Sequence, residues 1–171
     1  MDALIAEPWL LLLYPLFFVA IWIGICVAVA MMAGWPTLAQ RFRATGSPAG
    51  QVFFFASGSM RTGFLPVGYR NCLTVTVGEA GVRIRMLRLF RVMHAPLLIP
   101  WSAIDLVTRQ AGAFGRKGAV IAIRDFDRRL VLYGKAAEKV ATTFDKLKGS
   151  ASLDGGRRSR PLAMTAARPL A

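Results

Sequence analysis

The chain opens with a long apolar pattern that has no polar face. Residues 9–33 carry no charged side chain, so no amphipathic period is visible in them. A helix of this length extends about 37 Å at about 1.5 Å per residue, which exceeds the roughly 30 Å of bilayer hydrocarbon. We therefore predict a transmembrane helix over residues 9–35, with Trp9 and Trp35 as anchors at the two membrane interfaces.

Basic residues lie on only one side of this segment. Arg41 and Arg43 follow it closely and should contact lipid headgroups, whereas no Lys or Arg precedes it. The positive-inside rule then places residues 1–8 outside and the rest of the chain in the cytoplasm, anchored in the cytoplasmic (inner) membrane. A cleaved signal peptide is the alternative, but it fits less well because the N-terminus is acidic and the apolar run is long.

The hydrophobic period changes to two after residue 50. Residues 36–50 are predicted as a juxtamembrane linker, with a short helix over 37–44. Alternation then predicts strands, and an apolar stripe at helical spacing predicts a helix that stops at Gly149. Residues 149–171 are basic and polar and are predicted as a disordered tail. The strands are expected at 51–57, 69–77, 82–86, 97–101, 103–109, 119–124 and 129–134, with loops at 57–68 and 111–118 and the helix at 135–148.

The predicted fold is mainly β, a small sandwich or barrel capped by one C-terminal helix, because the sheet and the helix must each bury an apolar face. At this point the sequence resembles the pleckstrin-homology-like (PH-like) domains, including the GRAM-like and bacterial PH groups. The resemblance rests on "LTVTVGEAGVRI", "APLLIPWSAI" and "GAVIAIRDFDRRLVLYG" and covers about residues 50–148. It implies a PH-like fold over 51–148 and a binding role, but no particular ligand. Many bacterial members pair such a domain with a membrane helix.

Charge adds an expected partner. The net charge is +13, and all 22 Lys and Arg lie at or after Arg41. In 82–86 the alternation turns Arg83 and Arg85 outward on one strand face. A basic face beside an anionic leaflet gains about 1 kcal/mol per residue, although a merely solvated face is an equal alternative. The candidate lipid- or anion-binding residues are Arg83, Arg85, Arg88, Arg91, Arg116 and Lys117, with His94 also expected at the surface.

The sequence offers little chemistry for catalysis. His94 is the only histidine, and one of the two cysteines, Cys26, lies in the predicted membrane helix. Metal sites need clustered His and Cys, and the loop before Lys117 lacks the spacing of a phosphate-binding loop. We predict no enzyme, no metal and no cofactor. A nucleophilic pair of Cys72 and His94 is conceivable but has no recognisable orienting group.

Three binding functions remain open. The first is a single-pass membrane-anchored adaptor that contacts anionic lipid headgroups, a protein partner, or both. The second is an accessory structural subunit of a membrane complex, in which the helix packs on other helices. The third is a membrane-tethered nucleic-acid-binding domain that uses the basic cluster Arg157, Arg158 and Arg160; nucleic acid is the least favoured partner because no recognition motif is present. The sequence leaves the ligand and the oligomeric state open.

Overall fold

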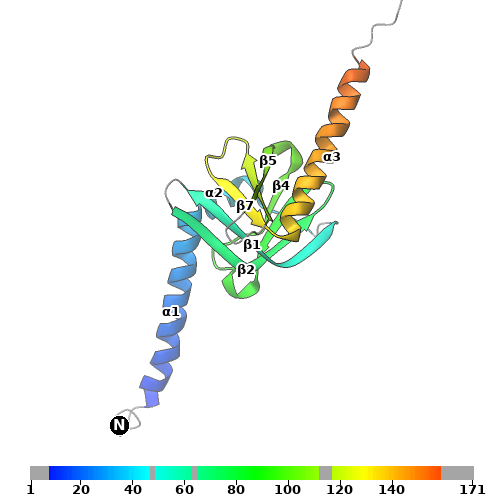
Figure 1. Cartoon of the computed structure of the whole chain (residues 1–171). Helices are drawn as coiled ribbons and strands as arrows, with labels where there is room; N and C mark the ends of the chain where they lie inside the picture. The colour runs from blue at the N-terminus through cyan, green and yellow to red at the C-terminus, as the bar shows by residue number, and fades with distance from the viewer. Residues whose placement is uncertain (1–7, 47–48, 63–64, 112–116, 159–171) are drawn as a thin grey trace, which may run out of the picture.

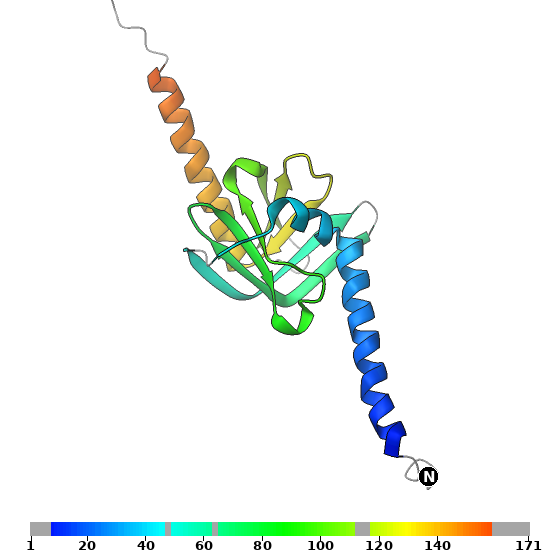
Figure 2. The same cartoon turned by 180° about the vertical axis from the view of Figure 1, so that it is seen from behind.

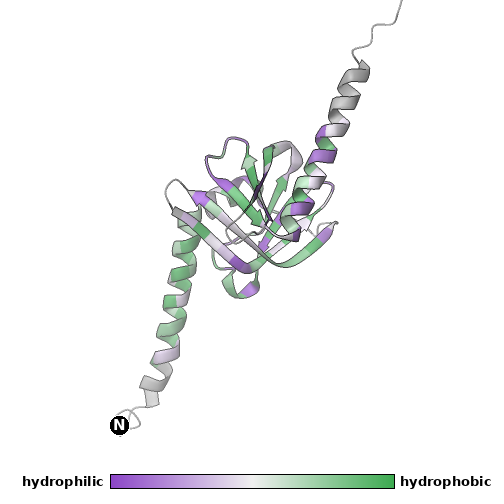
Figure 3. Ribbon diagram, viewed as in Figure 1, coloured by the Kyte–Doolittle hydropathy of each residue, from purple (hydrophilic) through white to green (hydrophobic). Residues whose placement is uncertain are grey.

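The computed structural model describes residues 8–46, 49–62, 65–111 and 117–158. Its first element, α1 (Pro8–Ala33), contains the stretch Leu13–Ala33, which is the one described helix long and apolar enough to cross a membrane. Figure 3 shows the hydrophobic colour running along α1. A left-handed Gly34, with φ of 68°, separates α1 from the short helix α2 (Trp35–Phe42).

Seven strands form one curled sheet in which each strand pairs antiparallel with its neighbours, in the order β4-β3-β2-β1-β7-β6-β5. A long C-terminal helix follows the last strand. The strands are β1 (Gln51–Thr62), β2 (Leu65–Val77), β3 (Gly81–Met86), β4 (Leu97–Pro100), β5 (Ile104–Ala111), β6 (Lys117–Ile123) and β7 (Arg129–Tyr133); the helix is α3 (Lys135–Arg158), and single turns of 3₁₀ helix are η2 (Arg88–Phe90) and η3 (Trp101–Ala103).

The core lies between the curled sheet and the first half of α3. Ala137, Val140, Ala141 and Phe144 recur at helical spacing and are all buried. They pack against the inward side chains of the strands, for example Leu73, Ile84 and Ile121. The prediction of a mainly β fold with a C-terminal helix is thus confirmed. Figures 1 and 2 show α1 and α3 leaving the sheet in opposite directions.

The predicted loop at 57–68 is wrong. Residues 57–62 instead belong to β1 and residues 65–68 to β2, which pair as a long hairpin, and β1 also pairs with β7. Gly58 and Ser59 look like loop residues in sequence, but a small residue is required here because a Cβ on Gly58 would lie 2.9 Å from the carbonyl oxygen of Val131. The close approach of β7 therefore explains the glycine.

Two element boundaries also differ from prediction. Gly149 does not stop the last helix, which continues to Arg158, so the predicted disordered tail is helical in its first part. Residues 159–171 lie outside the described residues. At the other end, α2 is part of the folded domain and not a linker, because Leu38 is fully buried in the core and Arg43 forms an isolated bridge with Leu97 of β4.

Candidate functional site

A groove on the outer face of β1, β2 and β3 brings together two of the predicted arginines. Sheet pairing places Thr76 between Val52 and Arg83, and it places Thr74 opposite Arg85. Side chains directly opposite on one face lie about 5 Å apart, so these residues form two adjacent rows. We call this the basic groove; its cavity has a volume of about 390 Å³ and is lined by Gly46, Val52, Phe54, Thr74, Thr76, Arg83 and Arg85.

The burial of the residues defines the shape of the groove. Thr74 and Thr76 are only 5% and 6% exposed although they are on the outer face. Their neighbours on both sides cover them, so the threonines form the floor. Arg83 and Arg85 form one wall, and Val52 and Phe54 form the other. Outward alternation of "RIR" was predicted from the sequence, and the burial of Ile84 between the two arginines confirms it.

One nitrogen of the Arg83 guanidinium group has a hydrogen-bond partner and another, which is buried, has none among the described residues. Its Nη1 donates to the carbonyl oxygen of Gly46 over 2.6 Å. Its Nε is buried, and no acceptor for it is found among residues 8–46, 49–62, 65–111 and 117–158. Buried donors are nearly always paired in folded proteins, whereas this N–H is an unsatisfied donor among the described residues, and a ligand would meet only the part of Arg83 that lines the groove.

A second and larger hollow adjoins the groove on the other side of Arg83. It has a volume of about 1,100 Å³ and reaches from the β2–β3 turn to α3, where Lys139 and Lys146 line it. Glu79 is its one acidic lining residue. Arg83 therefore lies between two cavities whose charged linings are mainly basic.

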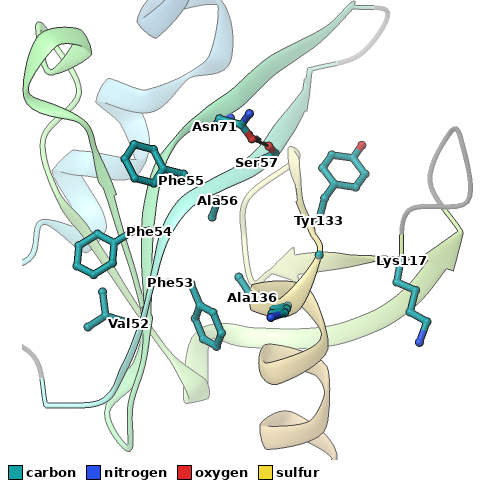
Figure 4. A pocket seen from close by; sticks show the side chains of 12 residues that line it. Val52, Phe53, Phe54, Phe55, Ala56, Ser57, Asn71, Lys117, Tyr133 and Ala136 are labelled. Atoms are coloured by element: carbon teal, nitrogen blue, oxygen red, sulfur yellow. Dashed lines mark hydrogen bonds between the residues drawn. The ribbon is translucent and has the colours of Figure 1, made fainter.

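The apolar wall was not predicted, and a bulge in β1 places Phe55 on the same side as Val52 and Phe54. Figure 4 shows Val52, Phe54 and Phe55 on one side of the strand, with Phe53 and Ala56 on the other. The register with β2 shifts between Phe53 and Ala56, and Phe55 has a left-handed φ of 53°. Phe54 and Phe55 are each 65% exposed. Three consecutive phenylalanines in a regular strand would lie on both faces of the sheet, so the sequence alone does not show that Phe54 and Phe55 share one side.

Lys117 lies apart from the two arginines. It starts β6, and β2, β1 and β7 separate that strand from β3 in the sheet. Its ammonium group pairs with Glu138 of α3 over 3.1 Å, and it lines a different hollow of about 570 Å³ between the bulge of β1 and the start of α3 (Figure 4). Arg116 lies outside the described residues.

Arg88 and Arg91 lie on an exposed turn after β3, close to α1 and beyond the lining of the basic groove. Arg41 binds Asp125 within the protein, with Nη2 3.0 Å from a carboxylate oxygen. Arg43 is exposed. Trp9 belongs to α1, but its side chain lies outside the described residues.

Trp35 is not a membrane-interface anchor, which corrects the prediction. It is fully buried, and its Nε1 donates to the carbonyl oxygen of Ala95 over 2.8 Å. Its ring makes edge contacts with Tyr69 and His94 at centroid distances of 5.6 and 5.0 Å. The apolar pattern alone could not separate an interfacial tryptophan from a core one, because the chain turns at Gly34 and brings the ring back onto the sheet.

His94 is buried as well, and its predicted surface position is wrong. Nδ1 lies 2.7 Å from the carbonyl oxygen of Val92, and Nε2 lies 3.2 Å from the hydroxyl of Tyr69. A neutral ring satisfies both contacts when Nδ1–H donates and Nε2 accepts from the tyrosine. Burial lowers the pKa of His94, although its hydrogen bond to Val92 opposes the shift. Burial also raises the pKa of Tyr69, so its hydroxyl keeps the proton it donates.

We expect the stability of the domain to fall in mild acid because of His94. A buried neutral histidine binds a proton more weakly than its unfolded counterpart, so stability is fully present above the unfolded pKa of about 6.5 and is lost as the pH falls below it. Thermal unfolding of the full chain in mild detergent, from about pH 8 to about pH 5, should show this loss. His94→Gln should have a shallower dependence; equal slopes in the two proteins would contradict the assignment.

The described residues offer no metal site, since no group of three His, Cys, Asp or Glu among them could hold an ion. Burial raises the pKa of Cys72, which keeps the thiol protonated. Comparison with protein-family models, with curated proteins and with solved structures gave no match to this chain. The basic groove is therefore interpreted from its own geometry.

Proposed function

We propose that this protein is a single-pass, membrane-anchored binding module. In this proposal α1 crosses the cytoplasmic membrane, the β domain is PH-like and lies in the cytoplasm, and the basic groove binds an anionic group. The observation that carries the binding role is that Arg83 and Arg85 line one groove over a floor of two buried threonines. Planar guanidinium donors of this kind suit phosphate and carboxylate oxygens.

The packing of α1 supports a permanent anchor. Cys26, Ala30 and Ala33 recur at helical spacing and are buried, and α1 contacts both β1 and β2. A cleaved signal peptide has no reason to share the core of the mature domain. The placement of all Lys and Arg after α1 favours a cytoplasmic domain.

The order of the elements supports the PH-like assignment. Seven antiparallel strands in a meander-like arrangement precede a single helix, and that helix fills the concave side of the sheet. The stretches that resemble PH-like domains fall on β2–β3, on β4 with η3, and on β6–β7. This is the part of the chain in which a PH-like domain would place its middle and last strands.

An anionic lipid headgroup is the ligand that fits best. β3 runs directly into the turn that contacts α1, and only Met86 and Leu87 separate Arg85 from Arg88. An extended chain covers this separation in about 10 Å. The open end of the basic groove therefore lies near the membrane that α1 would cross, where headgroup phosphates are abundant.

We expect the full chain to bind phosphatidylglycerol more tightly than phosphatidylcholine in micelles titrated with each lipid and analysed by native mass spectrometry. Arg83→Gln with Arg85→Gln should weaken binding of the anionic lipid on the order of thirtyfold, since each residue contributes about 1 kcal/mol near an anionic surface. The reason is the loss of both guanidinium groups from the wall of the groove, while the backbone pairing of β2 and β3 stays as it is.

The matched control is Lys117→Gln with Lys135→Gln. It removes the same charge from exposed positions at the other hollow, and the exposed pair of Lys117 with Glu138 contributes little to stability. Equal loss of binding in both variants would mean that net charge alone attracts the lipid. Equal affinity of the unmodified chain for the two lipids would overturn the proposed ligand.

A protein partner is the second candidate, and the exposed apolar wall favours it. Val52, Phe54 and Phe55 together leave large apolar side chains in solvent, which is typical of an interaction surface. In that case a fixed partner in the membrane should co-purify with the chain and be lost on Phe54→Ala with Phe55→Ala, and lipid preference should be absent. For nucleic acid, Arg157 and Arg158 belong to α3 and Arg160 lies outside the described residues, so that alternative stays a prediction.

A further inference from the structure

The segment from Arg88 to Met93, which we call the 88–93 loop, exposes both apolar and basic side chains. Leu89 is 66% exposed and Met93 is 49% exposed, while Arg88 and Arg91 are exposed beside them. Phe90 packs inward against the core. In Figures 1 and 2 this loop, in green, projects from the domain on the same side as α1.

The 88–93 loop contacts α1 well before that helix ends. The Nε1 of Trp22 lies 3.4 Å from the carbonyl oxygen of Leu89, and the rings of Trp22 and Phe90 have centroids 5.1 Å apart. Trp22 is eleven residues before Ala33, which corresponds to about 16 Å along the helix. The domain therefore flanks the last part of α1 and does not simply begin where the helix ends.

Helix length decides where the bilayer lies. A span needs about 20 residues, but residues 8–21, which precede Trp22, provide only about 21 Å of helix. Glu7 comes immediately before them, and Asp2 lies further toward the N-terminus. The hydrocarbon must therefore extend past Trp22 if α1 crosses it. The face of α1 that the domain does not cover remains apolar in this region, with Ile23, Ile25 and Met31 exposed.

We infer that the 88–93 loop is embedded in the cytoplasmic leaflet beside α1, so that the domain rests partly within the membrane. This inference depends on the proposal that α1 spans the bilayer. Leu89, which contacts Trp22, would then lie roughly 9 Å inside the hydrocarbon boundary, a depth that apolar residues of interfacial elements reach, and Met93 belongs to the same loop. Arg88 and Arg91 would extend their charged ends to headgroup phosphates.

Aromatic contacts and hydrogen bonds hold the 88–93 loop in the conformation that exposes Leu89 and Met93. The contacts of Phe90 with Trp22 fix it at one end, and His94 with Tyr69 and Trp35 fixes it at the other. Embedding then requires no refolding, and the conformational entropy cost of ordering the loop at the membrane is small.

The test measures membrane depth at three positions of the full chain in vesicles. With Cys26→Ala and Cys72→Ala in place, a single cysteine at Phe18→Cys, Leu89→Cys or Leu106→Cys carries an environment-sensitive fluorophore. All three native side chains are exposed, and Leu106 lies on β5, away from α1. Lipids that carry a quencher near the headgroup or deep in the acyl chain report the depth.

We expect deep quenching at Phe18, shallow quenching with a blue shift at Leu89, and neither at Leu106. Quenching at Phe18 with no response at Leu89 would overturn the embedded loop and leave the membrane anchor standing. Absence of quenching at Phe18 would instead overturn the anchor, and with it the loop. Equal shallow quenching at Leu89 and Leu106 would show that the whole domain touches lipid without a specific embedded loop.

Discussion

Trp35→Ala should lower the free energy of unfolding by about 3–5 kcal/mol, the usual effect of truncating a buried tryptophan. The ring fills the junction of α2, Tyr69 and His94, and it is fully buried. Its removal also leaves the carbonyl oxygen of Ala95 without its indole donor. Denaturant unfolding of the full chain in mild detergent measures the change.

Phe54→Ala is the control for Trp35→Ala, because it also removes an aromatic ring but from an exposed position. We expect it to change stability by less than about 1 kcal/mol. If Trp35→Ala were tolerated equally well, Trp35 would lie at the lipid interface, as the apolar pattern of the sequence had indicated, and α2 would not belong to the core.

Gly81→Ala should destabilise the domain by about 3 kcal/mol or more, since it combines backbone strain with a steric clash. Gly81 has φ of 150°, and a Cβ there would lie 2.1 Å from the carbonyl oxygen of Ile99. The clash is with the backbone of β4, so it can be relieved only by separating β3 from β4. Because Gly81 starts the strand that carries Arg83 and Arg85, binding of the anionic lipid should weaken at the same time.

Gly149→Ala should not lower the stability of the domain, in contrast to Gly81→Ala. Gly149 lies within α3, and a Cβ there would meet no atom within 4 Å. Alanine is a better helix former than glycine by up to about 1 kcal/mol, so the helix should be stabilised or unchanged. Comparable destabilisation by both substitutions would contradict the close pairing of β3 and β4 at Gly81. Thermal unfolding in the same detergent compares the two variants.

The period of the hydrophobic residues correctly predicted those strands and that helix that bury one face and expose the other. The alternation in β3 and the stripe Val140, Phe144 in α3 each require one apolar side, and both occur as expected. The extent of β1 and β2 was missed because Gly58 and Gly68 have no side chain to contribute to a period. The role of Gly58 depends on how closely β7 approaches, which is a tertiary effect, whereas a Cβ on Gly68 would meet no atom within 4 Å.

The candidate site was predicted only in part. The outward arginines follow from strand alternation, but their separation from Lys117 depends on strand order, which one sequence does not specify. His94 follows Arg88 and Arg91 in a mixed segment, so its charge suggested a surface position. The His94 side chain is instead buried, and its hydrogen bonds with Val92 and Tyr69 satisfy both nitrogens of a neutral ring.

The direction of α3 has a consequence for the reach of the chain. Among the side chains described on this helix, residues 135–150, the last buried one is Phe144, and the helix continues to Arg158 on the side of the sheet away from α1 (Figure 1). That extension is roughly 20 Å long at about 1.5 Å per residue. With α1 in the bilayer, α3 would project away from the lipid surface, and its end at Arg158 would be kept at a distance from the headgroups.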